Sequence, residues 1–154
     1  MTRLAVIPAR GGSKRIPRKN VRLFAGRPMI GYAIDLARDS DLFDHVVVTT
    51  DDVEVAETAR KLGAEVPFMR PEELSNDHTP TLPGVAHAIR AWRDLGWRVD
   101  TVCCVYPAVP LLRSSDLTAA LIMLEECDAP YVFPVLAYRS PIQRALRRDA
   151  GGRS

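Results

Sequence analysis

Residues 4–20 read LAVIPARGGSKRIPRKN, and this stretch determines the expected fold and site. An apolar run ends at Ile7, and a loop with paired glycines follows at once. Between Arg10 and Arg27 there are seven basic residues and no acidic one. Open α/β sheets bind ligands in loops at the carboxyl ends of their strands. Glycine amides combined with guanidinium and ammonium groups favour a polyphosphate as the ligand.

The composition places limits on the class of protein. The chain has 154 residues, of which 47% are hydrophobic, so we expect residues 1–154 to form a single α/β domain. The formal net charge is only +2, which favours a small anionic ligand over nucleic acid. The first apolar run is too short for a signal peptide or a membrane span, so we expect a cytoplasmic protein without a membrane partner. Cys103, Cys104 and Cys127 lack metal-site spacing and are expected to be reduced core thiols.

Apolar runs alternate with segments of helical period along most of the chain. The runs predict strands at 4–7, 46–50, 66–69, 101–106 and 131–136. The helical periods predict a helix starting near Pro28, one ending at Gly63, and two more at 82–92 and 117–124. This alternation is typical of repeated βα units. We therefore predict a three-layer α/β/α fold with a mostly parallel sheet.

The glycine pair does not belong to either common nucleotide motif, because neither G-x-x-x-x-G-K-[ST] nor G-x-G-x-x-G is present. Gly11 and Gly12 can still let the backbone approach an anion, and Ser13 adds a hydroxyl donor. Among the cations, Arg10, Lys14 and Lys19 are the strongest phosphate candidates, and the remaining arginines are expected to be solvated. A basic loop that is merely solvated is the alternative.

Asp51 and Asp52 follow the strand predicted at 46–50. Adjacent carboxylates at a strand end can bind magnesium. A helix N-cap, with Glu54 in the first turn, is the favoured interpretation. His78 lies in a long irregular segment and has no partner at metal-ligand spacing, so a structural or solvated role is favoured over a binding role.

The residues from 7 to 20 resemble the nucleotide-binding signature of the acylneuraminate cytidylyltransferases. Further motifs follow in the same order: TTDD at 49–52, RPEELS at 70–75 and YPAVP at 106–110. Within that family, SPIQRAL at 140–146 looks most like the pseudaminic acid cytidylyltransferases. The resemblance implies the Rossmann-like fold of the nucleotide-diphospho-sugar transferases.

The resemblance also implies a reaction. The anomeric hydroxyl of a nonulosonic acid, of pseudaminic or sialic type, attacks the α-phosphate of CTP, and CMP-sugar and pyrophosphate result, with Mg²⁺ as cofactor. Such chemistry needs charge neutralisation and positioning more than a protein nucleophile. The alternative is a catalytically inactive, truncated nucleotide-binding module.

The family's site residues transfer to this chain position by position. The implied nucleotide-binding residues are Ala9, Arg10, Gly11, Gly12, Ser13, Lys14, Lys19, Asn20, Arg70, Ser75 and Asp77. Arg10 and Lys19 are also the implied catalytic residues. The implied sugar-binding residues are Tyr106, Pro107, Gln143 and Arg144.

Two features depart from the family pattern. Relatives continue further and carry an Asp-x-Asp-type magnesium pair and a segment that crosses to a dimer partner, whereas this sequence stops at Ser154. The protein's metal ligands are therefore unknown, and a homodimer is in doubt. Relatives also commonly have a hydroxyl residue between the two prolines of 107–110, where this chain has Ala108 and Val109, which puts the identity of the sugar in doubt.

Overall fold

The computed structural model describes residues 1–76, 78–127 and 129–137. The chain divides into two compact units, Met1–Thr118 and Ala119–Ser154, and each is described by itself. The prediction of a single domain over 1–154 stays a prediction. The first unit contains the sheet and the loops that form the candidate site.

The central sheet has three parallel strands in the order β4-β1-β5. β1 is Arg3–Pro8, β4 is His45–Thr49 and β5 is Thr101–Cys104. Leu4 pairs with His45 on one side and with Val102 on the other. The four residues 4–7 are fully buried, as expected for a central parallel strand covered on both faces.

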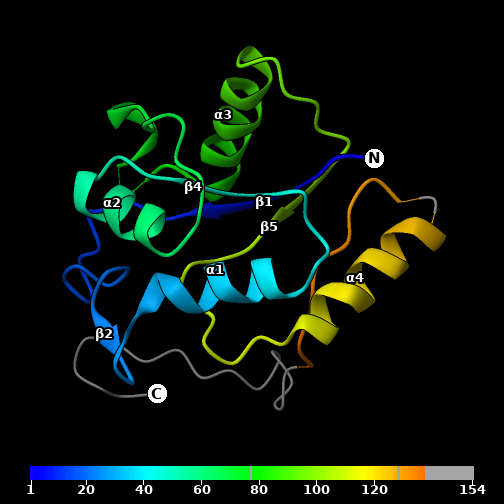
Figure 1. The fold of residues 1–154 in the computed structure, drawn as a ribbon, viewed down its shortest axis with the longest axis horizontal. Coiled ribbons are helices and arrows are strands. Elements are labelled where there is room, and N and C mark those ends of the chain that lie inside the picture. The colour runs from blue at the N-terminus through cyan, green and yellow to red at the C-terminus, as the bar shows by residue number, and fades with distance from the viewer. Residues whose placement is uncertain (77, 128, 138–154) are drawn as a thin grey trace, which may run out of the picture. The chain divides into compact units, whose positions relative to one another are not determined.

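Helices cover both faces of this sheet (Figure 1). α1 (Met29–Asp39) and α2 (Val53–Lys61) pack on the face that includes Ala5 and Ile7. α3 (Thr81–Asp94) packs on the opposite face, where Trp92 is buried against Leu4 and Val6. The alternation of side chains along β1 therefore feeds two separate apolar clusters. The predicted three-layer arrangement with a parallel sheet is confirmed.

The predicted helices are confirmed, and their ends follow the expected signals. α1 begins directly after Pro28. α2 has Asp52 as its N-cap and ends before Gly63, whose φ of +86° suits glycine. α4 spans Ser114–Glu126, and a short 3₁₀ helix, η1, spans Glu72–Leu74. Among the described helices, none combines the length and apolar character needed to cross a membrane.

Two predicted strands are wrong. Instead of a strand at 66–69, the chain makes one bridge to β4, where the Glu65 amide donates to Val46 O at 2.8 Å. Pro67 lacks an N–H and cannot continue such a ladder. Residues 131–136 also form no strand, and Pro134 interrupts that apolar run in the same way.

A small hairpin was not predicted. β2 (Leu23–Phe24) pairs antiparallel with β3 (Arg27–Pro28). Ala25 and Gly26 connect them with φ of 47° and 81°, and positive φ at both central positions is typical of a type I′ turn.

The cysteines are free, as expected, but only Cys103 is even partly buried. Cys104 and Cys127 are exposed, so the prediction of core positions is wrong for both. Cys104 is the last residue of β5, which pairs only with β1 among the described strands. Burial raises the pKa of the Cys103 thiol to about 11.

Candidate functional site

The candidate site begins where β1 ends. The Ala9 amide donates to Thr49 O at 3.0 Å, so the parallel pairing with β4 continues for one residue beyond the strand. Ala9 is fully buried. After Ala9 the chain leaves the sheet and forms the β1 loop, residues 10–22, at the carboxyl edge of the sheet. The structure thus puts the basic loop at the edge where open α/β sheets bind ligands.

Asn20 holds the base of this loop. The residue is 4% exposed, and its Nδ2 donates to Arg10 O at 2.9 Å. Its own carbonyl accepts from the Ile30 amide at 2.9 Å, which ties the loop to the first turn of α1. The Asn20 Oδ1 atom is buried and finds no hydrogen-bond partner among the described residues. A buried acceptor without a donor is unusual, and Asn20 lines neither of the two cavities described below.

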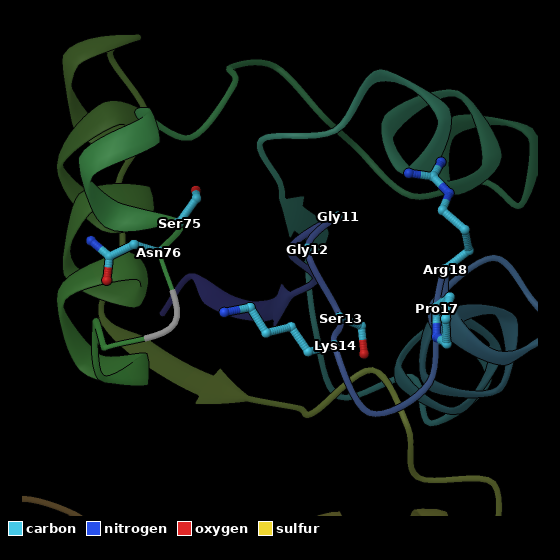
Figure 2. A pocket seen from close by; sticks show the side chains of 8 residues that line it. All are labelled: Gly11, Gly12, Ser13, Lys14, Pro17, Arg18, Ser75 and Asn76. Atoms are coloured by element: carbon cyan, nitrogen blue, oxygen red, sulfur yellow. The ribbon is translucent and has the colours of Figure 1, made fainter.

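Two cavities lie against the β1 loop and share Ser13 and Lys14. The smaller, of about 450 Å³, is drawn in Figure 2 and is lined by Gly11, Gly12, Ser13, Lys14, Pro17, Arg18, Ser75 and Asn76. The larger, of about 750 Å³, is lined by Arg10, Ser13, Lys14, Arg15, Ile16, Lys19 and His78. The larger cavity brings together four cationic side chains, and none of its described lining residues is acidic.

Arg10 connects the β1 loop to the segment after η1. Its Nη1 donates to Asn76 O at 2.8 Å. The position of that carbonyl is fixed in turn, because Asn76 Oδ1 accepts from the amides of His78 and Thr79, each at 2.9 Å. In Figure 2 the Lys14 side chain extends from the β1 loop toward the segment that carries Asn76. The two segments therefore face each other across the smaller cavity.

Arg70 lies beneath the site rather than in it. Its side chain is buried, and Nη2 donates to Thr49 O at 2.5 Å while Nε donates to Thr49 Oγ1 at 3.3 Å. Its amide donates to Thr50 O at 2.7 Å. Burial lowers the pKa of Arg70, an effect that nearby Asp51 opposes and Arg10 reinforces. Arg70 lines neither of the two cavities and fastens the 70–76 segment to the end of β4.

Asp51 and Asp52 turn toward the β1 loop. Asp51 Oδ1 accepts from the Gly11 amide at 3.0 Å. Asp52 Oδ1 accepts from the Val55 amide at 2.9 Å, which confirms the N-cap interpretation for Asp52. Asp52 also accepts two bonds from the Arg18 guanidinium, at 2.5 and 3.1 Å. The hydrogen bond from Arg18 holds the pKa of the Asp52 carboxyl below its usual range, although partial burial opposes this.

The described residues do not fit a protein-held magnesium ion. A hard cation needs several oxygen ligands. Asp51 and Asp52, the adjacent carboxylates at the site, are already bonded to Gly11 and to Arg18. Within the described part of the chain, no three histidine, cysteine, aspartate or glutamate side chains are close enough together to hold a metal.

The structure brings together most of the predicted nucleotide residues and separates others. Seven of them line the two cavities: Arg10, Gly11, Gly12, Ser13, Lys14, Lys19 and Ser75. Ala9, Asn20 and Arg70 are buried. Tyr106 and Pro107 line neither cavity, and Tyr106 Oη lies 3.2 Å from Thr81 Oγ1 at the start of α3. Asp77, Gln143 and Arg144 lie outside the described residues.

A family model described as "Cytidylyltransferase" matches residues 4–144, which include the β1 loop, the 49–52 turn and the 70–76 segment. The chain belongs to the cytidylyltransferase family. This family assignment confirms the resemblance found in the sequence. The matched range also extends beyond the described residues to include Gln143 and Arg144.

Individual cytidylyltransferases show how far the similarity extends. The pseudaminic acid cytidylyltransferase of Campylobacter jejuni subsp. jejuni serotype O:23/36 is 41% identical over 146 residues, which are 95% of this chain and 63% of that protein. The CMP-N,N'-diacetyllegionaminic acid synthase of Legionella pneumophila is 36% identical over 118 residues, with 77% and 51% of the two chains covered. The chain thus spans less than two thirds of the length of these relatives.

A solved structure extends the comparison to the fold. The structure of CMP:2-keto-3-deoxy-manno-octonic acid synthetase complexed with CTP superposes with a TM-score of 0.69 at 25% identity. The superposition covers 82% of this chain and 48% of that one. The predicted nucleotidyltransferase-type α/β fold is therefore confirmed.

Proposed function

We propose that the chain binds CTP at the β1 loop and transfers CMP to a nonulosonic acid of pseudaminic or sialic type, with release of pyrophosphate. The observation that carries this proposal is the larger cavity, where Arg10, Lys14, Arg15 and Lys19 meet at the carboxyl end of a parallel strand. Four cations around one cavity complement a triphosphate. The names of two relatives, a pseudaminic acid cytidylyltransferase and a CMP-N,N'-diacetyllegionaminic acid synthase, support the choice of acceptor.

The chemistry follows from where charge develops. The anomeric oxygen attacks the α-phosphorus, the bond to the bridging oxygen of the β-phosphate breaks, and the hydroxyl proton passes to solvent. Negative charge builds on the departing pyrophosphate, and cations already in place stabilise it without reorganisation. Arg10 and Lys19 serve this role as catalytic residues. Ser13 and the Gly12 backbone, which border the cavities, add neutral donors.

The nucleoside occupies the smaller cavity in this proposal. Ser75 lines that cavity, and Asp77 belongs to the same stretch of sequence. Arg70 contributes by fastening this segment to β4 rather than by facing the base. The buried Asn20 Oδ1 is an acceptor suited to a ribose hydroxyl.

The sugar acid is assigned to Tyr106, Pro107, Gln143 and Arg144. Tyr106 is 57% exposed, which leaves its ring open to a ligand. A guanidinium such as that of Arg144 pairs well with the acceptor's carboxylate. We further propose a cytoplasmic location. A homodimer stays a prediction.

Magnesium enters this proposal with the nucleotide. The described residues supply no ligand cage, so the phosphate oxygens and water would carry the ion. This same observation favours a second candidate function, a nucleotide-binding module that does not turn over. Both candidates share the nucleotide site.

One assay separates the two candidates. The purified chain is incubated with CTP, magnesium and pseudaminic acid, and pyrophosphate and the CMP-sugar are measured, with UTP and ATP as controls. CTP-dependent formation of both products supports the transferase. Saturable CTP binding without product supports the inactive module. Absence of CTP binding contradicts both.

A further inference from the structure

Two consecutive carboxylates fix the β1 loop against the start of α2. Asp51 accepts the Gly11 amide, and Asp52 accepts the Arg18 guanidinium. The same guanidinium also bonds to the Glu54 carboxylate. We call this set of residues the carboxylate clamp: Gly11, Arg18, Asp51, Asp52 and Glu54.

The approach at Gly11 is too close for any other residue. A Cβ built on Gly11 would lie 2.4 Å from Asp52 Oδ2, 2.7 Å from its Cβ and 2.9 Å from its Cγ. Asp52 cannot easily turn away, because it caps α2 through Val55 and is bonded to Arg18. The loop backbone therefore packs directly on the clamp.

Arg18 forms the other contact point. Its φ of 56° is in the left-handed region, which a bulky side chain rarely adopts. Its carbonyl accepts from the amides of Val21 and Arg22, so the chain turns sharply there. In Figure 2 its side chain extends away from Gly12 and Ser13, in keeping with its bonds to Asp52 and Glu54. Gly11 and Arg18 both line the smaller cavity. Both are held by the same short segment, residues 51–54, at the start of α2.

Considered by charge alone, Asp51 and Asp52 are unfavourable neighbours for a loop that binds an anion. Negative charge beside an anion-binding loop repels the anion, so its removal should tighten binding. The contacts give the opposite expectation, because loss of the Asp52–Arg18 pair would loosen the loop around Arg18. Ordering a free loop on binding costs conformational entropy, which weakens affinity. The two effects differ in sign, and an experiment can separate them.

We propose that Asp52, acting through Arg18, is a positioning residue that preorganises the β1 loop for the nucleotide phosphates. The proposal rests on the function proposed above. Arg18 then differs from the four cations that line the larger cavity. Those four face the phosphates, whereas Arg18 holds the loop in place.

The test measures CTP affinity by calorimetry and stability by thermal unfolding in the full chain. Asp52→Asn keeps an N-cap side chain, since asparagine caps as well as aspartate, but loses the charge that pairs with Arg18. We expect its CTP affinity to fall about tenfold, a typical coupling for residues in one network. The control, Glu57→Gln, removes one negative charge further along α2. It should leave the CTP affinity unchanged or slightly higher.

A rescue experiment distinguishes positioning from general damage. Arg18→Ala should weaken CTP binding as much as Asp52→Asn, and the double variant should be no worse than either. Relative to Arg18→Ala, Arg18→Lys should restore part of the affinity when Asp52 is present and less in the Asp52→Asn background, where only Glu54 still offers a carboxylate partner. Additive losses would mean that Arg18 contacts the ligand directly, which overturns the inference.

The outcomes also separate this inference from the proposed function. If the unaltered chain binds CTP and Asp52→Asn binds it more tightly, charge repulsion dominates and the clamp has no positioning role. If the unaltered chain binds no CTP, the proposed function fails and the inference fails with it.

Discussion

Alanine substitutions at the two adjacent glycines of the β1 loop should differ sharply in their effect on stability. In Gly11→Ala the new methyl would meet Asp52 atoms at 2.4–2.9 Å, where an ordinary contact is 3.4–4 Å. Relief requires either a shift of the loop backbone, at about 1–3 kcal/mol for overpacking, or release of the Asp52 cap, at about 1 kcal/mol. We therefore expect a stability loss of about 2 kcal/mol, which lowers Tm by about 4–8 °C for a chain of this size.

Gly12→Ala is the matched control. Apart from Gly12 and its two chain neighbours, no heavy atom of the described residues lies within 4 Å of a Cβ built at Gly12, so the stability of Gly12→Ala should stay within about 0.5 kcal/mol of the original. The same methyl would point into open space at the smaller cavity, and CTP affinity should fall. Thermal and urea unfolding followed by circular dichroism measure the stabilities. Equal Tm values for Gly11→Ala and the original chain would refute the packing argument.

Three further predictions concern Arg70, Cys103 and Asp52. Arg70→Met should lower the free energy of unfolding by about 1–3 kcal/mol in urea, because it removes the bonds of a buried guanidinium to Thr49 O and Thr49 Oγ1, although Thr49 O keeps the Ala9 amide as a donor; an unchanged urea midpoint would contradict this. Cys103, with a pKa of about 11, should resist alkylation at pH 8 in the folded protein and react after unfolding. Mass spectrometry of the peptide that contains Cys103 measures the labelling, and rapid labelling of the folded protein would contradict this prediction. The lowered pKa of Asp52 means that its stabilising charge is present above the ordinary carboxyl pKa near 4 and is lost as pH falls through the lower folded value. The stability gap between Asp52→Asn and the original chain should therefore stay constant from pH 7 down to about 4 and narrow as the pH falls further, and a gap that did not narrow there would argue against the ion pair.

Local signals in the sequence predicted the parts of the fold that depend on neighbouring residues. The buried run at 4–7, the N-cap at Asp52 and the helix end at Gly63 each have a short-range cause. The hairpin at 23–28 was missed although its turn carries Gly26, because Ala25 is not a usual residue for positive φ. The prediction of a strand at 131–136 was wrong because Pro134 lacks the N–H that a strand within a sheet needs.

The candidate site was predicted in its composition but not in its architecture. The cations and glycines of the β1 loop were found because they adjoin one another in sequence. The contacts of Gly11 with Asp51 and of Arg18 with Asp52 join residues 40 and 34 positions apart, and no local pattern predicts them. Arg18 was therefore interpreted as solvated. Arg70 was assigned to the nucleoside, whereas its side chain is buried against Thr49.

Calorimetric titration of CTP into the purified chain and its Lys19→Ala variant is the most direct test of the nucleotide site. Lys19 is preferred to Arg10 here, because Arg10 also holds Asn76 and its loss would disturb the structure. Lys61→Ala, at the far end of α2, is the matched loss of charge. We expect saturable binding to the original chain, an affinity about tenfold weaker in Lys19→Ala, and no change in Lys61→Ala. Absence of heat with the original chain, or equal affinity in Lys19→Ala, would contradict it.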